Sequence, residues 1–503
     1  MRFHRMTSPM KSHYIACDLG AESGRVILGT LEAGVLTLEE IHRFPNLTIR
    51  LGNSIRWDIL RTFFELKEGL GKIAARGISA ASLSVDSWGV DYVWSGFGQP
   101  MLAPAYIYRD PRTDTTFERA LATVGREKIF AETGIQFMSI NTLYQLIADV
   151  EASPELVRQA DGFLCIADFL HFLFSGRRAT EESLASTTQI YNPRTRDWSW
   201  ELIEQFDFPR SVFADIVPSG TRLGPLKPEV AEETGLVGTS VVATCSHDTG
   251  AAVAAVPASG GSHWAFLSSG TWSLVGVELD APLINEATRE GNFTNEGGFG
   301  GTTRFLKNIV GLWILQECRR DWERAGQTFN YVELNALAAD AEPLRTLIDP
   351  EDVRFLKPGG MPGKIESFAR ETGQPIPATP GAFTRAILES LALLYREKLD
   401  ALEVLTSRKI SKLHIVGGGS QSELLNQFSA NATGRLVLAG PVEATAIGNI
   451  LIQALVDGKI ADLAALRETV RRSIPTREFS PSSGPAWSDA TERFREICRT
   501  ATT

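Results

Sequence analysis

The sequence predicts an α/β protein with two domains, and three observations support this prediction. The chain has 503 residues, more than one hydrophobic core ordinarily contains. Apolar runs joined by a glycine turn occur at 14–31 and again at 265–279, and each is typical of a β-hairpin. At 241–256 and 413–427 an apolar strand leads through a sharp turn into a helix, which is the building unit of α/β folds.

The first hairpin, YIACDLGAESGRVILGTL, is a candidate phosphate-binding turn. Its tip offers backbone N–H groups, and Ser23 and Arg25 add side-chain donors. Asp18 would repel a phosphate but can hold Mg²⁺ or the waters around it. The alternative interpretation is a tight hairpin with a structural glycine, so this turn alone does not decide the function.

The stretch VVATCSHDTGAAVAAV, residues 241–256, contains the most informative carboxylate. Asp248 follows the strand and opens the helix, and the small residues behind it let backbone or a ligand approach closely. Open α/β sheets hold their ligands at the carboxyl ends of strands. Asp248 is therefore a candidate functional residue, and the alternative is an aspartate that only caps the helix.

A second strand-rich stretch, SLSVDSWGVDYVW at 82–94, places aromatic and acidic side chains side by side. Trp88 and Gly89 lie between Asp86 and Asp91. An aromatic face beside a carboxylate suits a sugar, because the ring packs on its apolar face and the carboxylate accepts from its hydroxyls. The alternative is a buried tryptophan beside a satisfied aspartate. From 117 to 176 the pattern becomes mostly helical.

The second half repeats this organisation. In AFLSSGTWSLVGVEL, Gly270 stands where Gly20 stands in the first hairpin, and Thr271 supplies a hydroxyl. The sequence RFLKNIVGLWILQECRR, residues 304–320, predicts one amphipathic helix with Asn308 and Gln316 on similar sides.

Further along, LHIVGGGSQSELLNQ predicts a strand, three glycines and a helix start. Such a turn can bind an anion or nucleotide at the helix N-terminus, or it can be a flexible connection. It fits neither the P-loop nor the dinucleotide fingerprint. Helices are also expected at 383–406 and after Glu443, and a loop at 475–485 before a last surface helix.

Composition excludes several classes of protein. The net charge of −10 argues against a nucleic-acid partner, and no apolar run reaches the ~20 residues of a membrane span. We expect the first fourteen residues to be a loose leader, with Met10 as an alternative start, and no signal peptide. The five scattered cysteines predict reduced, mostly buried thiols and a cytoplasmic protein. The oligomeric state stays open, a monomer or a small homo-oligomer.

Taken together, two glycine hairpins, a triple-glycine turn and an aspartate at a strand end predict two actin-like, ribonuclease H-like α/β domains with a cleft between them. We expect an N-terminal, sugar-side domain at 14–257 and a C-terminal, nucleotide-side domain at 262–460. Residues 461–503 form a tail with a helix in this prediction.

From about Ile15 to Ala454 the sequence resembles the FGGY-type carbohydrate kinases. The shared motifs are DLGAESGR, SVDSWGVDYV, YRDPRT, TGIQF with NTLYQL, SHDT, LSSGTWSL, TNEGG, LKNIVGLWILQ, LHIVGGG and AGPVEA. The resemblance implies ATP-dependent phosphorylation of a small sugar with Mg²⁺. It covers neither the leader nor the tail after about Pro475.

The resemblance also implies roles for individual residues. Asp248 matches the catalytic base, and the sugar contacts correspond to Gly89, His247, Thr249 and Asn308. The ATP contacts correspond to Ala21, Glu22, Ser23, Gly24, Arg25, Thr271, Gln316 and Gly418, and Asp18 matches the acid near Mg²⁺. Glu22 departs from relatives that have serine there, so we expect its side chain to point away. Some relatives have a cysteine pair at 428–433 that this chain lacks, so no disulfide is expected there.

The implied reaction is transfer of the γ-phosphoryl group of ATP to the C1 hydroxyl of a 6-deoxy ketose. Three alternatives remain open from the sequence: a kinase for another ketose such as L-fuculose or L-xylulose, a non-catalytic sugar or nucleotide sensor, and a phosphohydrolase on the same scaffold.

Overall fold

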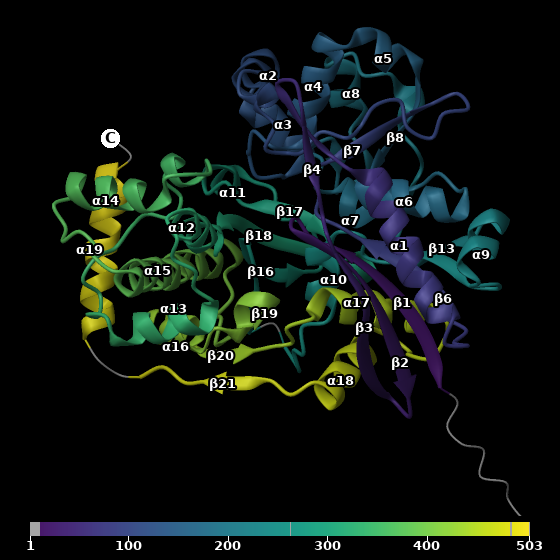
Figure 1. Ribbon diagram of the computed structural model, residues 1–503. Helices are drawn as coiled ribbons and strands as arrows, with labels where there is room; N and C mark the ends of the chain where they lie inside the picture. Colours follow the sequence, from purple (N-terminus) through teal and green to yellow (C-terminus); the bar gives the residue numbers. More distant parts are fainter. Residues whose placement is uncertain (1–10, 262, 483–484, 502–503) are drawn as a thin grey trace, which may run out of the picture. The chain divides into compact units, whose positions relative to one another are not determined.

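The computed structural model describes residues 11–261, 263–482 and 485–501 (Figure 1). The chain divides into two compact units. The first comprises the residues up to Pro257 together with Glu278–Phe305 and Ala444–Ile474, and the second comprises Ala258–Val277, Leu306–Glu443 and the residues from Pro475. Strands and helices alternate in both units, which confirms the predicted α/β class.

A six-stranded sheet, in the order β13-β14-β6-β1-β2-β3, forms the centre of the first unit. Its strands are β1 (Ser12–Leu19), β2 (Ser23–Glu32), β3 (Val35–Pro45), β6 (Ser82–Asp86), β13 (Thr221–Pro225) and β14 (Ser240–Ala243). β6 is parallel to both β1 and β14, so the carboxyl ends of these three strands share one edge. Asp18 and Asp86 are paired across β1 and β6 at that edge.

Helices α10 (Asp248–Ala254) and α17 (Ala444–Val456) pack against each other, and α17 lies beside β1 (Figure 1). Two polar residues of α17 reach the sheet. Nε2 of Gln453 donates to the carbonyl of Ile15 at 2.9 Å, and Nδ2 of Asn449 donates to the Asp86 carboxylate at 2.6 Å. These bonds hold α17, and with it α10, against the strands that end at the acidic edge.

The remaining elements of the first unit surround this sheet, and α1 and α6 pack directly against its strands. The helices are α1 (Ile59–Ala74), α2 (Thr116–Val124), α3 (Arg126–Thr133), α4 (Thr142–Ala152), α5 (Pro154–Gln159), α6 (Ile166–Ser175), α7 (Glu182–Ala185), α8 (Trp200–Gln205), α9 (Pro228–Thr234), α11 (Glu286–Glu290) and α18 (Leu463–Ser473). The short strands are β4 (Thr48–Leu51), β5 (Ser54–Trp57), β7 (Tyr92–Gly96), β8 (Ala160–Cys165), β9 (Thr180–Glu181), β10 (Tyr191–Asn192), β11 (Asp197–Trp198) and β12 (Ile216–Val217).

The second sheet has the order β17-β18-β16-β15-β19-β20-β21. Its strands are β15 (Trp264–Ser269), β16 (Trp272–Leu279), β17 (Thr294–Gly297), β18 (Thr303–Val310), β19 (Lys412–Val416), β20 (Leu436–Ala439) and β21 (Arg477–Phe479). The helices of the second unit are α12 (Trp313–Arg324), α13 (Tyr331–Asp340), α14 (Met361–Glu371), α15 (Pro380–Thr406), α16 (Glu423–Thr433) and α19 (Ala486–Ala501). Figure 1 shows α15 beside α13 and α16, with α19 at the end of the chain.

The predicted single helix over 304–320 is wrong. Strand β18 runs to Val310, and helix α12 begins at Trp313. Seven of the eight β18 residues are buried, so the apolar pattern reflects a strand covered on both faces and not one face of a helix. Gly311 and Leu312 separate the two elements. A Cβ at Gly311 would lie 2.6 Å from Oγ of Ser273, so the chain passes close to β16 at this point.

Most other local predictions are confirmed. Both hairpins, the long helix α15 and the helix after Glu443 form as expected. The predicted loop at 475–485 contains β21, and Ser12–Tyr14 belong to β1, so they are not part of a loose leader. Residues 1–10, with Met10, lie outside the described residues. None of the five cysteines forms a disulfide.

Helix α17 can approach α10 closely because residue 448 is glycine. A Cβ at Gly448 would lie 1.9 Å from the backbone oxygen of Ala251, which cannot rotate aside. We expect Gly448→Ala to push the two helices apart and to lower the free energy of unfolding by about 2 kcal/mol, measured by urea titration. Gly71→Ala is the matched control, because a Cβ at Gly71 in α1 meets no atom within 4 Å in the part of the chain that the structure describes. Equal stability of the two variants would contradict this prediction.

Candidate active site

Asp248 lies where the turn after β14 meets the turn after β6. Its backbone N–H donates to the carbonyl of Ser87 at 2.9 Å, and the N–H of Ser87 donates to the carbonyl of Ser246 at 2.9 Å. Ser87 and His247 also form a parallel bridge beyond the named strands. The pairing of the two strands therefore continues into both turns, and it fixes Asp248 close to the segment that contains Gly89.

The Asp248 carboxylate is recessed but reachable. Its Oδ1 accepts from the N–H of Thr249 and lies 3.1 Å from Oγ1 of Thr249 and 3.4 Å from Nε2 of His247. A third of the side chain is exposed (33%), yet surrounding protein atoms raise the pKa of Asp248 by burial, and the nearby charge of Asp18 raises it further. The N-cap residue of α10 is His247, so Asp248 is the first helical residue.

Behind Asp248 lies a buried polar group made of His247, Glu296 and Arg304. Nη2 of Arg304 donates to Nδ1 of His247 at 3.1 Å, and Nη1 lies 3.1 Å from Oε2 of Glu296. Nε of Arg304 donates to the carbonyl of Gly297 at 2.9 Å, and the Arg304 side chain is completely buried, at 0% exposure. A full guanidinium charge is thus held inside the first unit next to the ring of His247.

The acidic edge of the sheet is formed by Asp18 and Asp86. Asp18 is ion-paired with Arg25, and burial together with the charge of Asp18 holds the pKa of Asp86 well above its ordinary range. Oδ1 of Asp86 is buried and accepts no hydrogen bond from any described residue. Within the described residues no group of three or more His, Cys, Asp or Glu side chains is placed to hold a metal. One or two carboxylates with water ligands nevertheless fit Mg²⁺ that arrives with a nucleotide.

The hairpin β1–β2 has Gly20 to Glu22 at its tip, and Ser23, Gly24 and Arg25 follow as the first residues of β2. The N–H of Gly20 donates to the carbonyl of Ser23 at 2.9 Å, which closes the turn. Glu22 is exposed, and its carbonyl accepts from the N–H of Asn46 at 3.0 Å. A Cβ at Gly24 would lie 2.3 Å from the ring of Phe44, so this position admits only glycine without rearrangement.

Gly89 lies against the segment after α7. A Cβ at Gly89 would lie 2.7 Å from Oγ1 of Thr187, and the N–H of Val90 donates to the same oxygen at 3.2 Å. Just before it, the ring of Trp88 packs on Trp57 with 4.3 Å between ring centroids. The backbone of this segment is therefore held in one conformation.

The Asp91 carboxylate holds the segment with Trp88 and Gly89 in place through hydrogen bonds. Its Oδ2 accepts from Nε1 of Trp57 at 2.7 Å and from Nε1 of Trp88 at 2.9 Å, and its Oδ1 accepts from Nε2 of Gln145 at 3.1 Å. Burial raises the pKa of Asp91 to about 6 although these donors oppose the shift. Asp91 is fully buried and bonded to protein donors, which matches the structural alternative considered from the sequence.

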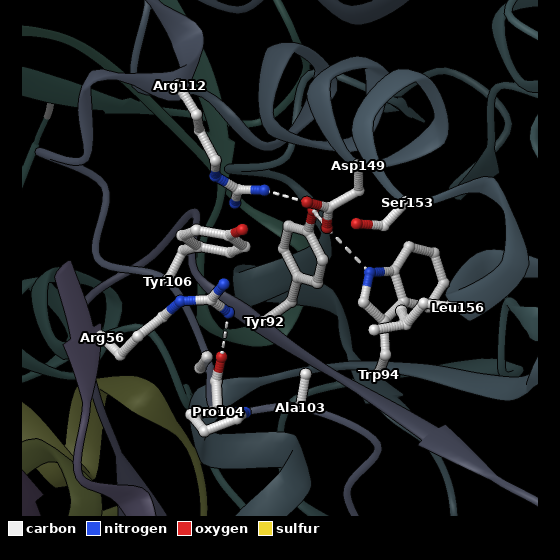
Figure 2. Close-up of a pocket in the computed structure, with 11 residues that line it drawn as sticks. Arg56, Tyr92, Trp94, Ala103, Pro104, Tyr106, Arg112, Asp149, Ser153 and Leu156 are labelled. Atoms are coloured by element: carbon white, nitrogen blue, oxygen red, sulfur yellow. Dashed lines mark hydrogen bonds and ion pairs between the residues drawn. The ribbon is translucent and has the colours of Figure 1, made fainter. Parts of the chain in front are cut away.

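A small cavity, with a volume of about 50 Å³, lies in the first unit beside this network (Figure 2). Figure 2 shows Arg56 and Arg112 on opposite faces of the Tyr106 ring, 3.2 and 3.6 Å from its centroid. The Asp149 carboxylate accepts from Tyr92 at 2.6 Å and pairs with Arg112. Nη2 of Arg112 also donates to Gln145 at 2.7 Å. The motif YRDPRT thus braces the helix that supports Asp91.

In the second unit, Thr271 lies in the turn of the β15–β16 hairpin. Its carbonyl accepts from the N–H of Gly311 at 3.1 Å, which joins this hairpin to the turn between β18 and α12. Asn308 lies on β18 and Gln316 on α12. The expectation that both lie on similar sides of one helix is therefore wrong.

The triple-glycine turn follows β19. Gly417 has φ +83°, and a Cβ at Gly419 would lie 2.0 Å from Oγ of Ser269. A Cβ at Gly418 would meet no atom of the described residues within 4 Å, so the backbone there is open to a ligand. The turn continues as a short 3₁₀ segment, Gly418–Gln421, before α16.

Comparison with known proteins agrees with this architecture. The model of the N-terminal domain of the FGGY family of carbohydrate kinases matches residues 13–255, and that of the C-terminal domain matches residues 265–456. The chain belongs to the FGGY family of carbohydrate kinases. A rhamnulokinase of Bacteroides thetaiotaomicron is 44% identical over 97% of this chain and 100% of its own length. A rhamnulokinase of Oceanobacillus iheyensis is 40% identical over 92% of this chain and 97% of its own length.

Solved structures show the same two-domain fold. A gluconate kinase from Lactobacillus acidophilus has a TM-score of 0.78 with 16% identity and covers 97% of each chain. A glycerol kinase from Plasmodium falciparum with ADP has a TM-score of 0.75 with 14% identity, over 98% of this chain and 97% of its own. No helix in the described part of this chain has the length and apolar character needed to cross a membrane.

Proposed function

We propose that this chain transfers the γ-phosphoryl group of ATP to the C1 hydroxyl of L-rhamnulose, giving L-rhamnulose 1-phosphate and ADP in L-rhamnose catabolism. The observation that supports it best is the 44% identity to a rhamnulokinase over 97% of the chain. The five cysteines without disulfides favour a reducing compartment, the cytoplasm. The proposal keeps the division expected from the sequence: a sugar-side domain at 14–257, a nucleotide-side domain at 262–460 and a tail at 461–503.

In this proposal Asp248 is the catalytic base. The C1 oxygen forms a bond to the γ-phosphorus, the bond from that phosphorus to the β,γ-bridging oxygen breaks, and the hydroxyl proton passes to the Asp248 carboxylate. A carboxylate whose pKa is raised by burial is a stronger proton acceptor than an ordinary aspartate, and 33% exposure of its side chain leaves it open to a hydroxyl.

Other residues bind and orient the substrates. In the first unit Gly89, His247 and Thr249 contact the sugar, and the turn from Ala21 to Arg25 donates to phosphate. In the second unit the ligand contact is Asn308, and the nucleotide contacts are Thr271, Gln316 and Gly418. Asp18, with Asp86 beside it, would hold Mg²⁺ or its waters. When bound, Mg²⁺ neutralises phosphate charge.

A panel of ketoses tests the substrate. With purified protein, ATP and Mg²⁺, and ADP release as the readout, we expect kcat/KM for L-rhamnulose to exceed that for L-fuculose and L-xylulose by about 10-fold or more. Phosphorus coupling to C1 of the product, measured by NMR, checks the position of transfer.

Each rival activity gives a different result in the same assay. If kcat/KM were higher for another ketose, that ketose would be the substrate in place of L-rhamnulose. Phosphate release at an equal rate without sugar would indicate a hydrolase, and sugar binding without ADP release would indicate a sensor.

A further inference from the structure

His247 has two ring nitrogens in different surroundings: Nδ1 contacts Arg304, and Nε2 lies on the side of Asp248. Arginine has only donors, so the Nη2–H that points at Nδ1 of His247 requires a lone pair on that nitrogen. The single proton of a neutral imidazole must then lie on Nε2. Nε2 is the nitrogen that faces Oδ1 of Asp248, 3.4 Å away.

The opposite tautomer is disfavoured by the same contacts. A proton on Nδ1 would have Oε2 of Glu296 3.4 Å away as an acceptor, but it would take the place of the lone pair to which Nη2 of Arg304 donates at 3.1 Å. A lone pair on Nε2 would then face the Asp248 carboxylate, which is repulsive. The carboxylate of Glu296 instead balances the charge of Arg304, with Oε2 of Glu296 3.1 Å from Nη1 of Arg304.

We propose that Arg304 is a positioning residue that fixes His247 as the Nε2–H tautomer, so that the ring presents a donor, not an acceptor, on the side of Asp248 and the sugar hydroxyl. His247 can then orient the reacting groups but cannot take the hydroxyl proton, which leaves this role to Asp248. The inference rests on the proposed function for its catalytic consequence, whereas the tautomer itself is a property of the unliganded protein.

The burial of the group makes this arrangement rigid. The side chains of Arg304, Glu296 and His247 are 0%, 5% and 9% exposed. Nε of Arg304 is anchored to the carbonyl of Gly297, and the N–H of His247 donates to Oγ of Ser183 at 3.0 Å. The guanidinium is thus held by a second bond, so it cannot turn away without leaving a buried polar atom unpaired. The bond to Ser183 comes from the backbone N–H of His247 and fixes the main chain from which the ring projects.

The first test measures the wild-type protein. With selectively ¹⁵N-labelled histidine, two-bond ¹H–¹⁵N NMR spectra distinguish a protonated from an unprotonated ring nitrogen, and His247→Gln identifies the signals of this one among seven histidines. We expect unprotonated Nδ1 and protonated Nε2. The reverse pattern, or protons on both nitrogens, would overturn the proposal whether or not the protein proves to be a ketose kinase.

The second test uses two variants. Arg304→Met with Glu296→Gln removes the donor without leaving a buried unpaired charge, and Arg304→Lys keeps a donor and a charge. We expect the double variant to show mixed His247 tautomers and a kcat lower by about 10- to 100-fold, with the KM for ATP unchanged. The single variant Arg304→Lys should keep the Nε2–H tautomer and most of the activity.

A purely structural role predicts a different outcome. In that case the double variant loses stability while its folded fraction keeps the wild-type tautomer pattern and kcat. Such a result would contradict the proposal, and it would leave the substrate assignment from the ketose panel unaffected.

Discussion

Replacing Asp248 by Asn is expected to lower kcat at least about 100-fold while ATP and ketose binding remain. The amide has the shape of the carboxylate and can still accept from Thr249, but it cannot take the hydroxyl proton. Steady-state kinetics together with calorimetric titration of ATP and sugar separates turnover from binding. Asp280→Asn is the matched control, because Asp280 is an exposed aspartate of the same unit.

The pH profile adds an independent check of the same role. Burial raises the pKa of Asp248, with Asp18 adding to the shift and His247 opposing it. The base is protonated at low pH, so kcat/KM should fall on the acid side with an apparent pKa above the ~3.9 of an ordinary aspartate. Near-normal turnover of Asp248→Asn would exclude Asp248 as the base.

The sequence predicts those parts of the site that local chemistry determines. The turn that contains Asp248, the two hairpins and the triple-glycine turn each depend on residues next to one another in the chain, so pattern and turn chemistry suffice. Between Thr303 and Val310 the same apolar pattern fits a strand and a helix, and only neighbouring strands decide between them. This is why Asn308 and Gln316 were wrongly expected on one helix.

The sequence did not identify the residues that act over long separations. Arg304 is charged and would be expected at the surface, yet it is buried against His247, 57 positions earlier in the chain. Asn449 reaches Asp86 across a separation of 363 residues. The motif TNEGG includes Glu296, but nothing in its spacing indicates that the carboxylate faces an arginine inside the unit. Such partners follow from the fold and not from local sequence.

Replacing Asp91 by Ala should lower the free energy of unfolding by about 3 kcal/mol or more, because it removes the acceptor of several buried donors at once. Two of these are the ring N–H groups of Trp57 and Trp88, and a third is the N–H of Tyr108, at 3.2 Å. Asp91→Asn keeps one oxygen for these three donors and loses only the bond from Gln145, at 3.1 Å, so about 1 kcal/mol is expected.

The informative quantity is the difference in the free energy of unfolding between Asp91→Ala and Asp91→Asn. Urea denaturation gives the free energies of unfolding, and the difference in fluorescence between each variant and the wild type reports on the surroundings of Trp57 and Trp88 among the ten tryptophans. Because Asp91 also fixes the segment with Gly89, the alanine variant should raise the KM for the ketose more than the KM for ATP. If the two variants were equally stable, or if the alanine variant kept the wild-type KM for sugar, then the bonds to Asp91 would not hold this part of the site in place.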